Sequence, residues 1–165
     1  MKTWITIIRW LVGILFIFSG LIKANDPLGL SYKMQEFFEV WGMHFMYPYT
    51  LTLSLLMNIF EVLAGVALII GWQMKWFSAL LLLLIIFFTF LTGYALFSGK
   101  IKTCGCFGDC LPLTPAQSFM KDLLLWAMIV LIRFSLKNIT PIFSTRVSLV
   151  ILVLAVVGTA GAQAY

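Results

Sequence analysis

Charged residues are scarce in this sequence, and their scarcity excludes an ordinary water-soluble protein. Only 10% of the 165 residues are Asp, Glu, Lys or Arg, and 62% are hydrophobic. Soluble domains carry about 25% charged and roughly 45–50% apolar residues, so no soluble fold could bury this much apolar surface. The sequence therefore predicts an integral membrane protein, with room for about five helices of ~20 residues each.

Basic runs and histidine are also lacking. The net charge is +5, but the eleven Lys and Arg are scattered, so we interpret them as topology signals and expect no nucleic-acid partner. His44 is the only histidine. A zinc site usually needs four nitrogen or sulfur ligands, which only three cysteines with His44 could supply, and we expect no metal. The absence of an internal repeat or of interrupted helices disfavours a transporter.

Five long apolar stretches occupy most of the chain. They are residues 4–22, 49–70, 76–97, 118–136 and 147–162, each close to the length that spans a bilayer. Backbone groups in lipid must be satisfied internally, so we expect all five to be α-helices. The predicted fold class is all-α, a polytopic membrane bundle. Thr114-Pro115-Ala116-Gln117 combines an N-cap, a first-turn proline and a capping-box glutamine, and predicts a helix start there.

The connection between the first two stretches is amphipathic. Asn25-Asp26-Pro27 signals a turn, after which apolar residues recur at helical spacing opposite charged ones. These apolar residues are Met34, Phe37, Phe38, Trp41 and Phe45. We expect an interfacial helix that lies on the membrane surface.

The basic residues indicate the orientation of the bundle. With the N-terminus in the cytoplasm, six of the eleven cations lie at the cytoplasmic end: Lys2, Arg9, Lys75, Arg133, Lys137 and Arg146. Three of these occur near the short connection between the last two stretches, where the positive-inside rule applies best. We therefore predict a multi-pass protein of the bacterial inner membrane, with the loop of residues 98–115 on the periplasmic side.

That loop carries all three cysteines, in Thr103-Cys104-Gly105-Cys106-Phe107-Gly108-Asp109-Cys110. An odd number leaves at least one thiol free or paired with another chain. A bond between Cys104 and Cys106 would close a very small ring, and strained, exposed disulfides are the more oxidising ones. Nearby lysines and a helix start would favour the reactive thiolate. Two alternatives stay open: a structural Cys106–Cys110 bond, and inert thiols.

Glu61 is the one carboxylate that we place deep within a span, about ten residues from either end of the second stretch. Asn58, Glu61 and Gly65 share one helix face by their spacing. A charge at that depth needs a partner, and Arg9 is the natural candidate. The functional interpretation is a polar pocket or proton relay near a lipid-soluble electron carrier; the structural one is an ion pair that ties two helices. Lys23, at the end of its helix, could simply snorkel.

The first helix and the loop resemble a known family. Arg9, Gly13, Phe16, Gly20 and Lys23 in the first stretch, with Glu61 and Gly65 in the second, look like the DoxX family of four-helix membrane proteins. Cys104-Gly105-Cys106-Phe107-Gly108 is similar to the segment of the related MauE proteins, which are implicated in disulfide formation during maturation of a periplasmic enzyme. DoxX-like relatives are tied to quinone-linked oxidation of sulfur compounds.

The resemblance implies a domain organisation. It covers roughly residues 1–136, so we divide the chain into a four-helix domain, residues 1–137, and a fifth transmembrane helix within residues 138–165. Bacteroidetes-type members with a similar cysteine loop carry such a helix before a periplasmic domain, which could follow here. Gly13 and Gly20 lie on one side of the first helix and should allow a neighbour to approach closely.

The leading hypothesis for function is a membrane thiol–disulfide oxidoreductase. In it Cys104 and Cys106 cycle between dithiol and disulfide, Cys110 helps to resolve a mixed disulfide, and electrons pass between periplasmic protein thiols and a membrane quinone. The residues assigned to quinone binding are Arg9, Lys23, Asn58 and Glu61. The alternative is a non-enzymatic membrane subunit of a larger envelope complex, with its cysteines as a structural staple.

Overall fold

The structure is a computed structural model that describes residues 2–101 and 113–164, and within these residues the chain forms helices and no strands. Five helices are long and apolar enough to cross a membrane. They are α1 (Lys2–Asn25), α3 (Thr50–Ile70), α4 (Met74–Ser98), α5 (Pro115–Phe134) and α6 (Thr145–Ala164). The prediction of an all-α polytopic membrane protein with five spans is confirmed.

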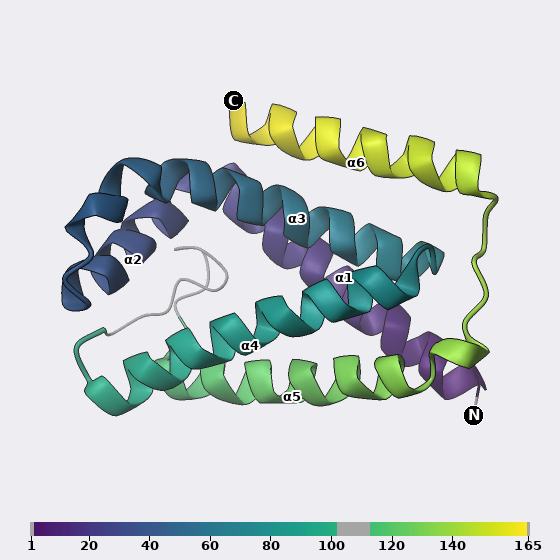
Figure 1. The fold of residues 1–165 in the computed structure, drawn as a ribbon, viewed down its shortest axis with the longest axis horizontal. Coiled ribbons are helices and arrows are strands. Elements are labelled where there is room, and N and C mark those ends of the chain that lie inside the picture. The colour runs from purple at the N-terminus through teal and green to yellow at the C-terminus, as the bar shows by residue number, and fades with distance from the viewer. Residues whose placement is uncertain (1, 102–112, 165) are drawn as a thin grey trace.

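The first four long helices form two pairs. α1 crosses α3, and α4 runs beside α5 (Figure 1). The end of α1, the start of α3, the end of α4 and the start of α5 all lie at one end of the molecule, which we call the loop end because the cysteine-bearing segment joins α4 to α5 there. The other end, with the N-terminus and the turn between α3 and α4, we call the turn end.

Glycines let α1 and α3 approach closely, as the sequence predicts. A Cβ atom added at Gly65 would lie 2.7 Å from the backbone oxygen of Gly13, and one added at Gly20 would lie 2.6 Å from Val62 Cγ2. Both distances are too short for a real Cβ contact. The two helices therefore meet backbone to backbone, which maximises van der Waals contact where lipid offers no hydrophobic driving force.

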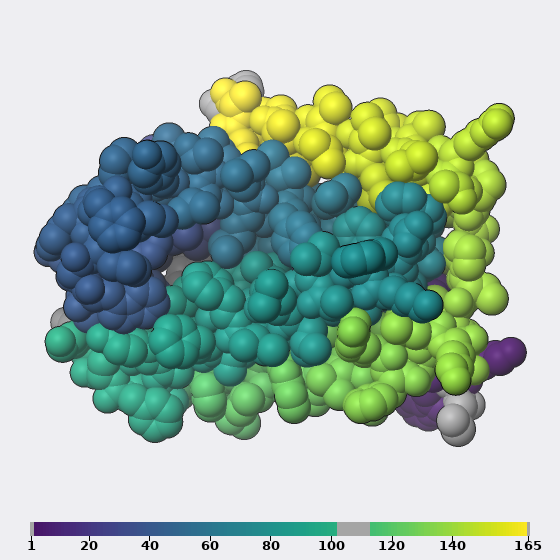
Figure 2. All heavy atoms as spheres, viewed as in Figure 1, coloured from purple at the N-terminus to yellow at the C-terminus, as the bar shows by residue number. Residues whose placement is uncertain are grey.

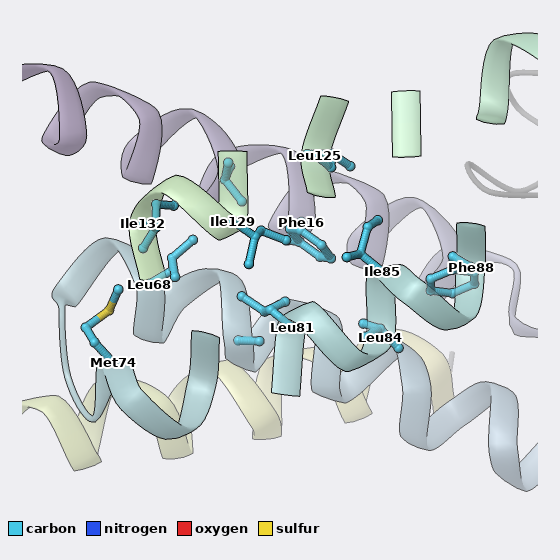
Figure 3. Packing of buried hydrophobic residues seen from close by; sticks show 12 residues of the cluster. Phe16, Leu68, Met74, Leu81, Leu84, Ile85, Phe88, Leu125, Ile129 and Ile132 are labelled. Atoms are coloured by element: carbon cyan, nitrogen blue, oxygen red, sulfur yellow. The ribbon is translucent and has the colours of Figure 1, made fainter. Parts of the chain in front are cut away.

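The remaining core fills the space between the two helix pairs. Phe16 of α1, Leu68 of α3, Leu81 and Ile85 of α4, and Ile129 of α5 point toward one another there (Figure 3). Leu68, Leu81 and Ile129 have no exposed surface. This apolar layer lies between the loop end and the turn end and joins the pairs into one bundle.

The helix predicted to lie on the membrane surface is α2 (Pro27–Val40), and its surroundings differ from the prediction. It starts where expected, with Asp26 Oδ1 accepting a 3.2 Å hydrogen bond from Gly29 N. Its apolar residues Met34, Phe37 and Phe38 are buried against α3 and α4 rather than left for lipid. It also stops at Val40, and Phe45 belongs to the separate 3₁₀ helix η1 (His44–Tyr49).

The fifth span returns along the outside of the first pair. After the 3₁₀ turn η2 (Leu136–Asn138), an extended segment pairs with α3 through a 2.9 Å bond from Ile142 N to Ile70 O. α6 then runs along α3 and forms one edge of the molecule (Figure 2). Gln163 Nε2 donates to Leu55 O at 3.2 Å near the end of α6. At the start of α5, the predicted Thr114–Gln117 capping box is present.

Candidate functional site

Glu61 lies inside the bundle, and its partner is Lys23. The two side chains are each 2% exposed, and Lys23 Nζ lies 2.5 Å from Glu61 Oε1. Ser19, one turn before Lys23 on the same face of α1, donates to Glu61 Oε2 at 3.3 Å. The ammonium group also lies 4.9 Å from the centroid of the Phe88 ring, within the range of a cation–π interaction. Both donors that Glu61 has among the described residues therefore come from α1.

A second buried carboxylate, Asp122 of α5, lies nearby. It has no exposed surface, and Thr92 Oγ1 of α4 donates to its Oδ2 at 3.1 Å. Lys121 Nζ lies 3.2 Å from its other carboxylate oxygen, Oδ1. Asp122 was not predicted from the sequence, where Glu61 was the one carboxylate expected deep within a span. Asp122 lies at helical spacing from Ser118, Leu125 and Ile129, which are buried on the inward face of α5. That periodicity is the sequence signal that could have predicted a buried Asp122.

These two ion pairs face the same cavity, which we call the charged cavity. Its lining residues are Leu15, Phe16, Ser19, Lys23, Glu61, Ile85, Phe88, Lys121, Asp122 and Leu125, and its volume is about 30 Å³. A space of this size holds roughly two water molecules. Two carboxylates and two ammonium groups thus meet between the helix pairs with no net formal charge, and apart from the Ser19 hydroxyl the rest of the wall is apolar.

Two predictions about the intramembrane charges are wrong. Arg9 does not pair with Glu61, because it lies 14 residues, or roughly 21 Å along α1, from Lys23, which takes that place. Its guanidinium lies instead at the turn end, where a Cβ at Gly71 would be 2.9 Å from Arg9 Nη1. Lys23 does not snorkel to the surface; at 2% exposure it is buried.

Asn58 shares its helix face with Glu61, as predicted, but it is not among the residues that line the charged cavity. It is fully buried, and neither its Oδ1 nor its Nδ2 has a hydrogen-bond partner within the described part of the chain. Of the four residues assigned to quinone binding, the structure therefore brings together Lys23 and Glu61 in the cavity wall. Asn58 lies one turn from Glu61 but outside that wall, and Arg9 lies at the other end of α1.

The three cysteines, Cys104, Cys106 and Cys110, lie outside the described residues, and their pairing stays a prediction. The helices that hold the cysteine loop are described. Thr92 comes six residues before the end of α4, and Asp122 seven residues after the start of α5, which places them roughly 9–10 Å along each helix from the loop. The two helices that the cysteine loop joins, α4 and α5, thus form part of the wall of the charged cavity.

The chemistry of the charged cavity suits a quinone, but its size does not. Ammonium and hydroxyl donors in apolar, aromatic walls are the groups that would hold a quinone carbonyl. A quinone ring needs several times the space of the roughly two water molecules that about 30 Å³ admits. The ring therefore does not fit in this cavity, whereas water molecules do.

Comparison with known protein families shows a match over most of the chain. The family model described as methylamine utilisation protein MauE matches residues 1–135. The matched region contains α1 to α5 and the cysteine loop, and α6 follows it. No curated protein and no solved structure matches the chain.

Proposed function

This multi-pass membrane protein belongs to the MauE family, and from that premise we propose that it is a membrane thiol–disulfide oxidoreductase. Cys104 and Cys106 form its redox pair, on the periplasmic side of the bacterial inner membrane. Its protein partner is a periplasmic protein with a thiol or disulfide to exchange. The observation that carries the proposal is that Asp122, in the wall of the charged cavity, lies roughly 10 Å along α5 from a loop with three cysteines.

The exchange steps balance within the two proteins. A thiolate of the partner attacks the Cys104–Cys106 disulfide and forms a mixed disulfide, and one thiol of this chain leaves. The partner's second thiolate resolves that bond, so that the partner ends as a disulfide and Cys104 and Cys106 end as thiols. In a stalled mixed disulfide, Cys110 can instead attack the sulfur of this chain, which forms a disulfide within the chain and releases the partner as a thiolate.

Reoxidation of the pair releases two electrons and two protons. A membrane quinone, which takes up both, is the oxidant that we propose, and it is not assigned to the charged cavity. The residues of this chain contribute to the reaction by transferring the protons. Glu61 and Asp122 face a cavity with room for water, and a carboxylate that exchanges its ammonium partner for a proton can pass that proton on.

Differential alkylation with mass spectrometry tests the redox pair. The full chain in membranes is reduced by a dithiol and then incubated with or without added quinone, and the thiols at Cys104, Cys106 and Cys110 are counted. Reoxidation that requires quinone, and is lost in Cys104→Ser and Cys106→Ser, supports the proposal. A bond that responds to neither thiol nor quinone contradicts it and favours the structural subunit. A membrane-impermeant alkylating reagent tests the side of the membrane.

The role of the charged cavity has its own test. Asp122→Asn keeps the shape of the side chain and an oxygen for the Thr92 hydroxyl, but it cannot take up a proton. We expect quinone-dependent reoxidation to slow roughly tenfold or more, while reduction by a dithiol stays unchanged. Glu36→Gln, which alters an exposed carboxylate of α2, is the matched control. Equal reoxidation rates in both variants would exclude the cavity from the reaction.

A further inference from the structure

The turn end of the molecule carries cations without carboxylates. Its basic residues are Lys2, Arg9, Lys75, Arg133, Lys137 and Arg146. Within the described residues, every carboxylate belongs instead to the loop end or to the charged cavity: Asp26, Glu36, Glu39, Glu61 and Asp122. No carboxylate of the described residues therefore neutralises the positive charge of the turn end, which leaves that charge available to an external anion.

A groove at this end places two of the cations together. It has a volume of about 230 Å³ and is lined by Gly71, Gln73, Met74, Lys75, Leu136, Lys137 and Ile139. Lys75 comes from the start of α4 and Lys137 from η2 after α5, and both are exposed. Arg133 Nη1 donates to Lys75 O at 3.3 Å, which holds the end of α5 against the start of α4.

The groove also contains the N-terminus of α4, a 25-residue helix without a side-chain N-cap. The backbone N–H groups of Met74 and Lys75 have no hydrogen-bond acceptor among the described residues. Free N–H groups and the positive end of the helix dipole make such a terminus a binding site for an anion.

A third positive group lies behind the wall of the groove. Arg9 is 5% exposed, and its Nε has no hydrogen-bond partner within the described part of the chain. Its Nη1 lies against Gly71, where an added Cβ would be 2.9 Å away, and Gly71 lines the groove. A buried guanidinium without a carboxylate raises the potential in the groove, because it is poorly screened there.

We propose that this groove binds the headgroup phosphate of an anionic phospholipid. The lysines and the α4 N–H groups contact the phosphate, and Arg9 adds to the field behind it. A lipid fits better than free phosphate because Trp76 and Phe134, 71% and 85% exposed, continue from the same helix ends onto the surface that faces the acyl chains. Basic pockets between transmembrane helices are typical sites for such headgroups. The inference does not depend on the proposed redox function.

Native mass spectrometry of the full chain in detergent tests the site, with phosphatidylglycerol, phosphatidylcholine and inorganic phosphate as probes. Wild type should retain phosphatidylglycerol in preference to phosphatidylcholine, and a matching concentration of inorganic phosphate should not displace it. The double variant Lys75→Gln with Lys137→Gln should bind phosphatidylglycerol roughly 25-fold more weakly, at about fivefold for each lysine.

Two further variants serve as controls. Lys75→Arg with Lys137→Arg keeps the charge and should bind like wild type. Lys33→Gln with Lys100→Gln removes two lysines from a groove at the loop end that also contains Glu36 and Glu39, and it should have no effect. Equal retention of the two lipids by wild type, or unchanged retention by the first glutamine variant, would overturn the site. Displacement by inorganic phosphate would overturn its assignment to lipid.

Discussion

The loop end and the turn end of this bundle balance buried charge in opposite ways. Toward the loop end, Lys23 pairs with Glu61 and Lys121 with Asp122 around the charged cavity. At the turn end Arg9 is equally buried, but no carboxylate in the described residues faces it. One end thus neutralises its charges inside the protein, and the other directs an uncompensated field outward.

This difference determines which substitutions should destabilise each end of the bundle. At the loop end the Lys23–Glu61 ion pair holds α1 to α3, and the Thr92–Asp122 hydrogen bond holds α4 to α5. Removing one partner of the ion pair strands the other in a medium of low dielectric constant. Toward the turn end the bundle depends on backbone contact and close-packed apolar side chains, with Gly13, Gly65, Leu68 and Leu81 at the contacts. Substitutions can therefore break either end separately.

The largest effect should come from Glu61→Gln, which leaves Lys23 buried without its counter-charge. We expect the free energy of unfolding in detergent to fall by about 3–5 kcal/mol. Adding Lys23→Met should recover most of the loss, because the stranded ammonium group is then gone. Glu36→Gln, which breaks the partly exposed pair with Lys33, should cost at most about 1 kcal/mol. If Glu61→Gln and Glu36→Gln lowered the free energy of unfolding equally, the buried ion pair would contribute no more to stability than the partly exposed one.

Leu81→Ala should come next, since it opens a cavity in the apolar layer between the helix pairs. Leu81 has no exposed surface, whereas Leu83, two residues on in α4, is 66% exposed. We expect a loss of about 2–5 kcal/mol for Leu81→Ala and a much smaller one for Leu83→Ala, both from denaturant unfolding in micelles. A similar loss at both positions would contradict the packing described for α4.

Gly65→Ala should have a smaller effect, because one methyl group forces α1 and α3 apart without removing a partner. Its Cβ would meet Gly13 O at 2.7 Å and Ile17 N at 3.1 Å, and overpacking of this kind costs about 1–3 kcal/mol. Gly158→Ala in α6, with no atom within 4 Å of the added Cβ, is the matched control. If thermal unfolding gave the same midpoint for both variants, the close α1–α3 contact would be wrong.

The smallest effect should follow from Thr114→Ala, at the point where the cysteine loop enters α5. Thr114 Oγ1 accepts a 3.3 Å bond from Gln117 N, and Gln117 Oε1 accepts one of 3.1 Å from Thr114 N. Loss of this N-cap should cost about 1 kcal/mol, measured by urea unfolding, and Thr114→Ser should cost much less. A serine variant as unstable as the alanine variant would argue against the cap.

The fold was largely predictable because its signals are local. Apolar stretches of bilayer length gave five helices whose ends lie within a few residues of those observed. The capping box at Thr114 and the turn at Asp26 depend only on neighbouring residues, and both are present. What the apolar face of α2 contacts was not predictable, because the sequence of an amphipathic helix has the same pattern whether its apolar side contacts lipid or protein.

The sequence alone was enough to predict the membrane class, the spans, a glycine face of α1 that admits a close neighbour, and the confinement of carboxylates to the cysteine-loop end and the middle of the bundle. Only the tertiary structure decided that Glu61 meets Lys23 rather than Arg9 and that Asp122 joins them across a cavity. The physical reason is that helical spacing fixes which residues share a face, whereas the partner across an interface depends on how far one helix is shifted along another. Arg9 and Lys23 lie about 21 Å apart along α1, so the position of α3 along α1 decides which of the two Glu61 meets.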